Sequence, residues 1–448
     1  MNGLREYLGF FLLLILWLPF KGGAQHYRIT DGEKYEKIKF DLVNNLIIVP
    51  IEVNGIELSF ILDSGVRRPI LFNLTERDSI TLNNVSEISI QGLGNGDPIK
   101  ALVSKGNTFK IKDIVNESQQ LYVVLDKEMN FSPKLGIPIH GIIGYDLFRD
   151  FVVDINYHAR SLKFHDPSFY KGRVTKRDQR LPISIIGNKS YVDGSVLMED
   201  EREVPVKLLV DTGSGDALWL FKDLEKGLGV PEKNFHDYLG KGLNGHIFGR
   251  RTKITGIKIG RFELKDVKAA FPDMESYAAI SNLGNRNGSV GGEVLKRFDI
   301  VFNYAANEII IRKNGHFGEP FHYNMSGIDV QHNGVRYIAE KIKEARPATV
   351  GTTAYDFGNV QLIKEDVTRL SLVPEIVVSG IRAGSPADEA GLKEGDIILA
   401  INGKKIHRFK LQEVVKLLNE REGKRIQVLI ERYNRDLLFS FVLENVLK

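Results

Sequence analysis

Two aspartates of the chain, Asp63 and Asp211, each end an apolar run and each precede a hydroxyl residue and a glycine. Two carboxyl groups about 3 Å apart cannot both ionise, so such a pair shares one proton. The ionised member can take a proton from water, and the protonated member can donate one to a carbonyl oxygen. These two residues could therefore hydrolyse a peptide bond.

The residues that follow each aspartate suit a paired site. Gly65 and Gly213 permit tight turns that bring backbone N–H groups to the carboxylates. The hydroxyls of Ser64 and Thr212 can hydrogen-bond across the pair and hold the two loops together. The Asp-Ser-Gly and Asp-Thr-Gly motifs therefore predict two loops that meet.

The two loops differ at the next position. Ser214 has a hydroxyl that can donate to Asp211, whereas Val66 has none and adds apolar bulk beside Asp63. A hydrogen bond to a carboxylate favours its ionised form. We therefore expect Asp63 to hold the shared proton, and we expect a working pH from weakly acidic to neutral.

An internal duplication explains why there are two aspartates. Ile142-Ile143-Gly144 follows the first aspartate at almost the spacing at which Ser289-Val290-Gly291 follows the second. Residues 141–157 also align with residues 288–304 without a gap. Short β-branched runs separated by Gly or Asn predict strands and hairpins in both units. In each unit, we expect the apolar-apolar-Gly segment to pack behind the aspartate loop.

These motifs resemble those of the pepsin and retropepsin superfamily over residues 36–315. The resemblance implies a mainly β fold, in which two retropepsin-like β-barrel lobes at residues 25–170 and 171–315 form a bilobal aspartic protease. It implies a catalytic dyad of Asp63 and Asp211, polypeptide substrates, an active monomer, no cofactor and no metal. The residues expected to support the dyad are Ser64, Gly65, Thr212, Gly213 and Ser214.

Glycine-rich tracts stand where such proteases carry the flap, a hairpin over the site. The flap candidates are Gly92, Leu93, Gly94, Gly242 and Gly245. The second tract also has the G-x-G-x-x-G spacing of a dinucleotide motif, but β-type sequence follows it where that motif needs a helix. We therefore interpret both tracts as hairpin turns.

The last part of the chain, residues 316–448, resembles a PDZ domain, which is a small α/β fold. Ser385–Leu392, Ile397–Gly403 and an amphipathic helix predicted at Leu411–Leu418 carry the resemblance. It implies that a peptide or the C-terminal segment of a partner binds there. Before these motifs, Val335–Leu372 predicts a helix and a long connection.

Five residues are candidates for the peptide-binding site of this domain. Backbone N–H groups of Ser326, Gly327 and Ile328 could bind a carboxylate, and Leu411 and Val415 could line a groove. The same apolar helix face also suits the core of the domain. The helix is therefore a candidate for both roles.

The N-terminus predicts an export signal over residues 1–24, with Arg5, the apolar run Leu8–Phe20 and a small-residue cleavage site. The run is shorter than the roughly 20 residues that cross a bilayer, and no later segment is long and apolar enough. We therefore expect a periplasmic or secreted protein without a membrane span after the signal is removed.

Composition and missing motifs argue against several other classes of protein. The chain has no cysteine, which excludes disulfides. Its 61 basic and 57 acidic residues give a net charge of only +4, so nucleic-acid binding is not expected. Neither an H-E-x-x-H zinc motif nor a G-x-S-x-G nucleophile motif occurs.

Two alternatives to the enzyme remain open. The chain could be a catalytically silent peptide-binding protein of the same fold at the cell envelope, or a protein in which the PDZ domain is the principal functional unit. Both aspartates are present in their motifs, which favours the enzyme.

Overall fold

The computed structural model describes residues 26–447, except 75–77, 91, 93–95, 127, 173, 200–201, 243–244, 277–284 and 348–361, and gives only the backbone of 343–347 and 362–366. The predicted export signal lies outside the described residues. No helix among the described residues has both the length and the apolarity needed to cross a membrane.

The chain divides into two compact units. Unit 1 comprises Met1–Asn130 and Ile139–Phe321, and unit 2 comprises Phe131–Pro138 and His322–Lys448. The boundaries predicted from sequence place Phe131–Pro138 in the first protease lobe, whereas in the structure this segment groups with unit 2.

The first lobe of unit 1 consists of short strands and one helix. They are β1 (Arg28–Ile29), β2 (Tyr35–Lys39), β3 (Asp41–Val43), β4 (Leu46–Val53), β5 (Ile56–Leu62), β6 (Ile70–Leu71), β7 (Ser86–Ile90), β8 (Ile99–Ile111), β9 (Ile114–Val124), β10 (Gly141–Ile143), α3 (Tyr145–Asp150), β11 (Val152–Asn156) and β12 (Ser161–His165). The hairpin of β4 and β5 turns at Asn54 and Gly55, whose φ angles of 48° and 89° suit a tight turn.

The second lobe repeats this plan. Its elements are β13 (Gln179–Ile186), β14 (Lys189–Leu197), β15 (Glu203–Val210), β16 (Leu218–Leu220), β17 (Asn234–Gly242), β18 (Gly245–Ile259), β19 (Phe262–Pro272), η2 (Met274–Ser276), β20 (Gly288–Val290), α4 (Gly292–Leu295), β21 (Phe298–Asn303), η3 (Tyr304–Ala306) and β22 (Glu308–Lys313). A short helix follows the apolar-apolar-Gly segment in each lobe, α3 in the first and α4 in the second.

The two lobes share one local arrangement beside the aspartates. In the first lobe, β10 pairs in parallel with β5 and antiparallel with β6. In the second lobe, β20 pairs in the same way with β15 and β16. Ile143 and Val290, at the ends of β10 and β20, are buried. The prediction that the apolar-apolar-Gly segments pack behind the aspartate loops is confirmed.

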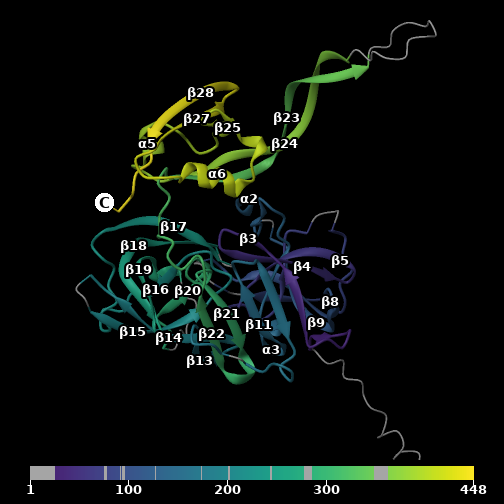
Figure 1. Cartoon of the computed structure of the whole chain (residues 1–448), viewed down its shortest axis with the longest axis vertical. Helices are drawn as coiled ribbons and strands as arrows, with labels where there is room; N and C mark the ends of the chain where they lie inside the picture. Colours follow the sequence, from purple (N-terminus) through teal and green to yellow (C-terminus); the bar gives the residue numbers. More distant parts are fainter. Residues whose placement is uncertain are drawn as a thin grey trace, which may run out of the picture. The chain divides into compact units, whose positions relative to one another are not determined.

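A continuous sheet joins the lobes. The order β13-β22-β21-β11-β12-β2 brings three strands of the first lobe onto the sheet of the second, through the antiparallel pair β11 and β21. Apolar side chains of both lobes form one core cluster, which includes Phe148 and Phe302 with ring centroids 4.9 Å apart. The mainly β bilobal architecture is therefore confirmed, and Figure 1 shows its layered strands.

Unit 2 is a small sheet with short helices. Its elements are α2 (Ser132–Leu135), β23 (Ile328–Pro347), β24 (Leu362–Ile381), α5 (Pro386–Glu389), β25 (Ile397–Ile401), β26 (Lys404–Lys405), η4 (Ile406–Arg408), α6 (Leu411–Leu418), β27 (Arg425–Arg432) and β28 (Arg435–Val442). The helix predicted at Leu411–Leu418 is confirmed by α6.

The helix predicted at the start of Val335–Leu372 is wrong. Its described parts, Val335–Pro347 and Leu362–Leu372, lie in β23 and β24, which form the long antiparallel ribbon drawn in green in Figure 1. Tyr337 and Leu372 are paired in that ribbon, and both side chains are exposed. Apolar side chains of this ribbon are exposed like its polar ones, so apolar residues do not mark a buried face, on which strand prediction depends.

Candidate active site

Asp63 and Asp211 follow the ends of β5 and β15, and the strand behind each aspartate supports its backbone. The Asp63 N–H donates to the Ile143 carbonyl at 2.7 Å, and the Asp211 N–H donates to the Val290 carbonyl at 2.9 Å. Each predicted apolar-apolar-Gly segment thus hydrogen-bonds to its own aspartate. The two aspartate loops therefore begin at equivalent positions, each after a strand that pairs in parallel with the strand behind it.

Reciprocal hydrogen bonds tie the two aspartate loops together. The Ser64 N–H donates to Thr212 Oγ1 at 3.0 Å, and the Thr212 N–H donates to Ser64 Oγ at 3.1 Å. Ser64 Oγ also donates to the Val210 carbonyl at 2.6 Å, and Thr212 Oγ1 to the Leu62 carbonyl at 2.8 Å. Both hydroxyl residues are fully buried. These bonds cross from lobe to lobe and fix the separation of the two carboxyls.

The glycines of the two motifs lie directly against the carboxyls. The Gly65 N–H donates to Asp63 Oδ1 at 2.6 Å, and the Gly213 N–H donates to Asp211 Oδ1 at 3.1 Å. A Cβ added to Gly213 would lie 2.2 Å from Asp63 Cγ. The carboxyl of the first lobe therefore touches the backbone of the second loop, where only glycine fits.

Burial raises the pKa of both aspartates. The pKa of Asp63 rises to about 7, first through burial and then through the Asp211 charge, and a hydrogen bond with the Asp211 carboxyl contributes. The pKa of Asp211 is also raised by burial, but the charges of Arg286 and Lys189 oppose that rise. The pair therefore holds one proton at weakly acidic pH, more readily on Asp63.

The cause of this asymmetry differs from the one predicted. Ser214 donates its backbone N–H to the Asp211 carboxylate, which lowers the pKa of that group. The described hydrogen bonds include none from the Ser214 hydroxyl to Asp211, so the support that the structure shows from Ser214 comes from its backbone. The backbone of the second loop and the two cations therefore take the place of that hydroxyl.

Two cations that the sequence did not predict, Lys189 and Arg286, lie near the dyad. Lys189 begins β14, which pairs with β15, so it stands next to the end of the strand that precedes Asp211. Arg286 lies just before β20, where its Nε–H donates to the Gly288 carbonyl at 2.9 Å and its guanidinium lies 5.3 Å from the ring centroid of Phe221. Strand pairing brings them to the site.

The charges at the site do not balance. Lys189 acts on both aspartates, and Arg286 acts on Asp211. Burial and Arg286 lower the pKa of Lys189, whereas the two aspartates raise it. Among the described residues, Lys189 has no carboxylate at ion-pair distance. A dyad with one shared proton has one negative charge, so two charged cations leave a positive excess.

Replacing Lys189 by Met should move the pH profile of peptide hydrolysis to higher pH. The Lys189 charge lowers the pKa of both aspartates, so its loss raises both. The ionised member then forms at higher pH, and the shared proton is kept to higher pH. Initial rates measured from acidic to alkaline pH test this, with Lys189→Arg as the charge-retaining control. Unchanged limbs in the Met variant would show that Lys189 does not act on the dyad.

The flap candidates are only partly described. Leu93 and Gly94 lie outside the described residues, and Gly92 follows β7. In the second lobe, Gly242 of β17 pairs with Gly245 of β18 at the end of an antiparallel hairpin. A strand, not a helix, follows the glycines, which agrees with the rejection of a dinucleotide motif.

The candidate residues of the PDZ domain lie within α6 and near its C-terminal end. Ser326–Ile328 forms a buried loop at the start of β23, and the neighbouring Met325 N–H donates to Oδ1 of Asn419, just after α6, at 2.7 Å. Leu411, at the start of α6, is only 2% exposed and belongs to the core, whereas Val415 is 37% exposed. Val415 alone of the two helix candidates is accessible.

The backbone donors of the Ser326–Ile328 loop are already used. The N–H groups of Ser326 and Gly327 donate to Asn324 Oδ1 at 3.2 and 3.0 Å. The Ile328 N–H donates to Ser326 Oγ at 3.1 Å. The prediction that these three groups are available to a ligand carboxylate is therefore wrong.

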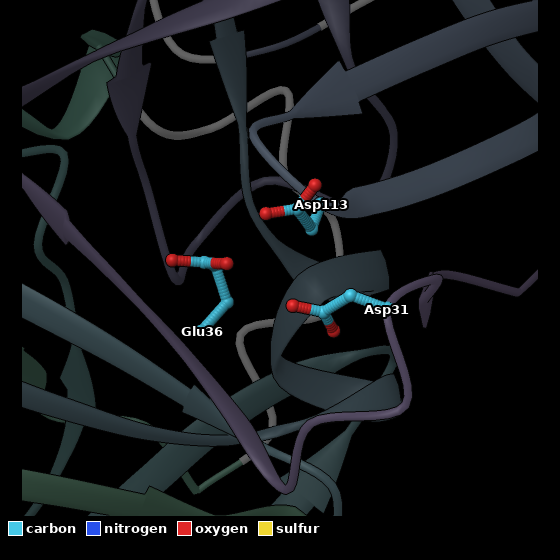
Figure 2. A group of neighbouring side chains, drawn as sticks. All are labelled: Asp31, Glu36 and Asp113. Carbon is cyan, nitrogen blue, oxygen red and sulfur yellow. The ribbon is translucent and has the colours of Figure 1, made fainter.

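One acidic cluster could be mistaken for a metal site. Carboxylate oxygens of Asp31, Glu36 and Asp113 lie within 4.8 Å of one another. Figure 2 shows these three side chains side by side. Lys112 Nζ donates to Glu36 Oε1 at 2.9 Å, and the Glu33 N–H donates to Asp31 Oδ1 at 3.0 Å. Two of the three carboxylates, those of Glu36 and Asp31, thus already accept hydrogen bonds from a lysine and from a backbone N–H. These bonds explain the cluster without a metal ion.

Two interlocked lobes with one Asp-[Ser/Thr]-Gly loop each define a fold of the aspartyl protease class, and unit 2 has the fold of a PDZ domain. A family model described as aspartyl protease matches residues 49–147 and 193–292, and a PDZ domain model matches residues 377–432. Each lobe matches the protease model separately, as the internal duplication predicts. The chain thus combines an aspartyl protease fold with a C-terminal PDZ domain.

Among known proteins, the chain is similar to an Arabidopsis thaliana protein named as a Do-like protease (Do-like 14). The two are 34% identical over 122 residues, which is 25% of this chain and 25% of that protein. The chain thus matches only a quarter of the length of this relative.

Proposed function

We propose that the chain is an aspartic endopeptidase in which Asp63 and Asp211 activate water. The hydrogen bonds between Ser64 and Thr212 support this most directly, because they hold two buried carboxyls at a fixed separation. Burying two carboxyls is costly, and such groups with raised pKa values concentrate at catalytic sites.

The proposed reaction uses the asymmetry of the pair. Asp211, the more readily ionised carboxylate, takes a proton from a water molecule, whose oxygen forms a bond to the scissile carbonyl carbon. Asp63 donates its proton to the carbonyl oxygen, which gives a neutral tetrahedral diol. The C–N bond then breaks as the nitrogen takes the proton from Asp211 and a diol hydroxyl returns one to Asp63. Two product ends leave, and the pair regains its single proton.

The remaining parts of the proposal concern location and recruitment. The sequence pattern of residues 1–24 supports export to the periplasm or the medium. The PDZ domain supports recruitment of polypeptides. Both aspartate loops come from one chain, which supports an active monomer, so specific activity should not fall on dilution.

Cleavage of an unfolded protein, measured with and without pepstatin, tests this function. Pepstatin contains a hydroxyl that occupies the position of the tetrahedral diol, so the proposed dyad should bind it and proteolysis should stop. Mass spectrometry of the products would identify cleavage within the substrate chain. Binding of the unfolded protein without cleavage would instead support the silent peptide-binding alternative.

A further inference from the structure

We propose that the face of the PDZ domain formed by β23 and the start of α6 takes an internal peptide segment rather than a free C-terminus, and that its occupant in this protein is Phe131–Pro138. Two independent features of unit 2 support this. One is the closed state of the loop that would receive a carboxylate. The other is the segment that lies at the opposite end of α6.

The first feature is that the Asn324 side chain already accepts hydrogen bonds from the Ser326–Ile328 loop. Asn324 Oδ1 accepts both the Ser326 and the Gly327 N–H groups, and the Ser326 hydroxyl donates to the same atom at 2.8 Å. An amide oxygen thus occupies the position in which these donors would hold a carboxylate oxygen. Asn324 Nδ2 also donates to the Ile328 carbonyl at 2.8 Å, which closes the loop on itself.

The Arg382 side chain reinforces this closed loop. Its Nη1 donates to the Asn324 carbonyl at 2.9 Å, and its backbone N–H donates to the Gly327 carbonyl at 2.9 Å. The Arg382 guanidinium is therefore bonded to the same asparagine. A free C-terminal carboxylate would have to replace several hydrogen bonds within the domain before it could bind there.

The second feature is the segment at the other end of the helix. The short helix α2 lies beside β23 and the start of α6, within the unit that contains the PDZ domain, as Figure 1 shows. Gln412 Nε2 donates to the Leu135 carbonyl at 2.6 Å, and the Leu135 side chain is only 6% exposed. A side chain of α6 thus binds the backbone of an internal segment.

The residue after Leu135 makes this contact specific. Gly136 ends α2 with a φ of 68°, and a Cβ placed on it would lie 2.7 Å from Leu411 Cβ. The helix therefore accepts a buried leucine followed by a glycine in the left-handed conformation. This is a turn within a chain, and it presents no terminal carboxylate.

The segment also continues into the protease lobe. Pro138 is followed by Ile139 and then by β10, whose last residue accepts the Asp63 N–H. An internal ligand is always present at a high effective concentration, so it outcompetes weak external peptides. This face of the PDZ domain therefore binds the chain's own segment first.

The test measures peptide binding to the full-length protein by fluorescence anisotropy. The probes are residues 130–139 as a peptide with both ends blocked, and an unrelated peptide ending in valine, as the free acid and as the amide. We expect the wild type to bind none of them strongly. We expect Gly136→Ala, which clashes with Leu411, to release the segment and bind the blocked peptide at least about tenfold more tightly than the wild type does.

Two control variants keep this test decisive. Gly403 also has a positive φ, 74°, but a Cβ there meets nothing within 4 Å, so Gly403→Ala should behave as the wild type. Asn324→Ala should gain a preference for the free acid over the amide, whereas Asn324→Asp, which keeps the acceptor oxygen, should not.

Two results would overturn the proposal. One is a wild-type protein that binds the free acid at least about tenfold more tightly than the amide. The other is a Gly136→Ala variant that remains folded and does not bind the blocked peptide. Neither result bears on proteolysis by the dyad, so this inference and the proposed function can fail separately.

Discussion

Asp63→Asn and Asp211→Asn should each lower the rate of peptide hydrolysis on the order of a thousandfold or more and leave the protein folded. Each aspartate is one half of an acid–base pair that shares a proton, and an amide can neither accept a proton from water nor donate one to the carbonyl oxygen. The loops themselves should persist, because the bonds between Ser64 and Thr212 do not involve the carboxyls.

The measurement is the initial rate on an unfolded protein substrate, together with circular dichroism of each variant. Asp154→Asn is the matched control, because Asp154 is a carboxyl of the same unit whose pKa burial also raises, and it lies on β11 away from the motifs. That control should keep its activity. If either dyad variant retained activity within about tenfold of the wild type, the dyad assignment would be wrong.

The same variants report on stability. The pKa of Asp63 is raised in the folded protein from 3.8 to about 7, so the folded state binds more protons than the unfolded state between these values. The contribution of Asp63 to stability is therefore complete below about pH 4 and is lost as pH rises towards 7. Asp63→Asn has no such titration, so its stability relative to the wild type should increase as the pH rises over this window.

The two aspartate loops could be predicted from sequence because their chemistry is local. A glycine two residues after each aspartate and a hydroxyl between them are read directly from the motifs, and Gly65 and Ser64 act as expected. The duplication also indicated which later segments would support the loops. Such features depend on short-range backbone geometry, which a motif encodes.

Lys189 and Arg286 could not be predicted in the same way. Neither belongs to a motif, and both reach the dyad through strand pairing, β14 with β15 and β20 with β15. Gly187 and Asn188, just before Lys189, are typical turn residues, and both have a positive φ. They indicate a hairpin, but they do not indicate which other strand pairs with it in the sheet. Charges that act on a site through tertiary pairing leave little trace in a single sequence.

The PDZ domain shows a related limit. The Leu411–Leu418 helix was predicted because its apolar period is strong, but the donors of Ser326–Ile328 were assigned to a ligand from the resemblance alone. Asn324 occupies them instead, which follows from one side chain that the family pattern does not specify. The contact of Leu135 with the same domain depends on residues far apart in sequence.

Gly213→Ala should abolish most activity and destabilise the protein by about 1–3 kcal/mol, because it forces atoms together in a packed interior. Its Cβ would lie 2.2 Å from Asp63 Cγ and 2.3 Å from Asp63 Oδ2, so the Asp63 carboxyl or the second loop must move. Both positions are fixed by the hydrogen bonds between the loops, and little relaxation is available without breaking them.

A displacement of about 1 Å in a reacting group can cost on the order of a hundredfold in rate, so we expect at least that loss for Gly213→Ala. Gly318→Ala in the same unit is the matched control, because its Cβ would meet nothing within 4 Å and its φ is not positive. Urea denaturation and initial rates of both variants separate the two effects. A Gly213→Ala protein as stable and as active as the control would mean that the Asp63 carboxyl does not lie against the second loop, and the paired geometry on which the proposed reaction depends would be incorrect.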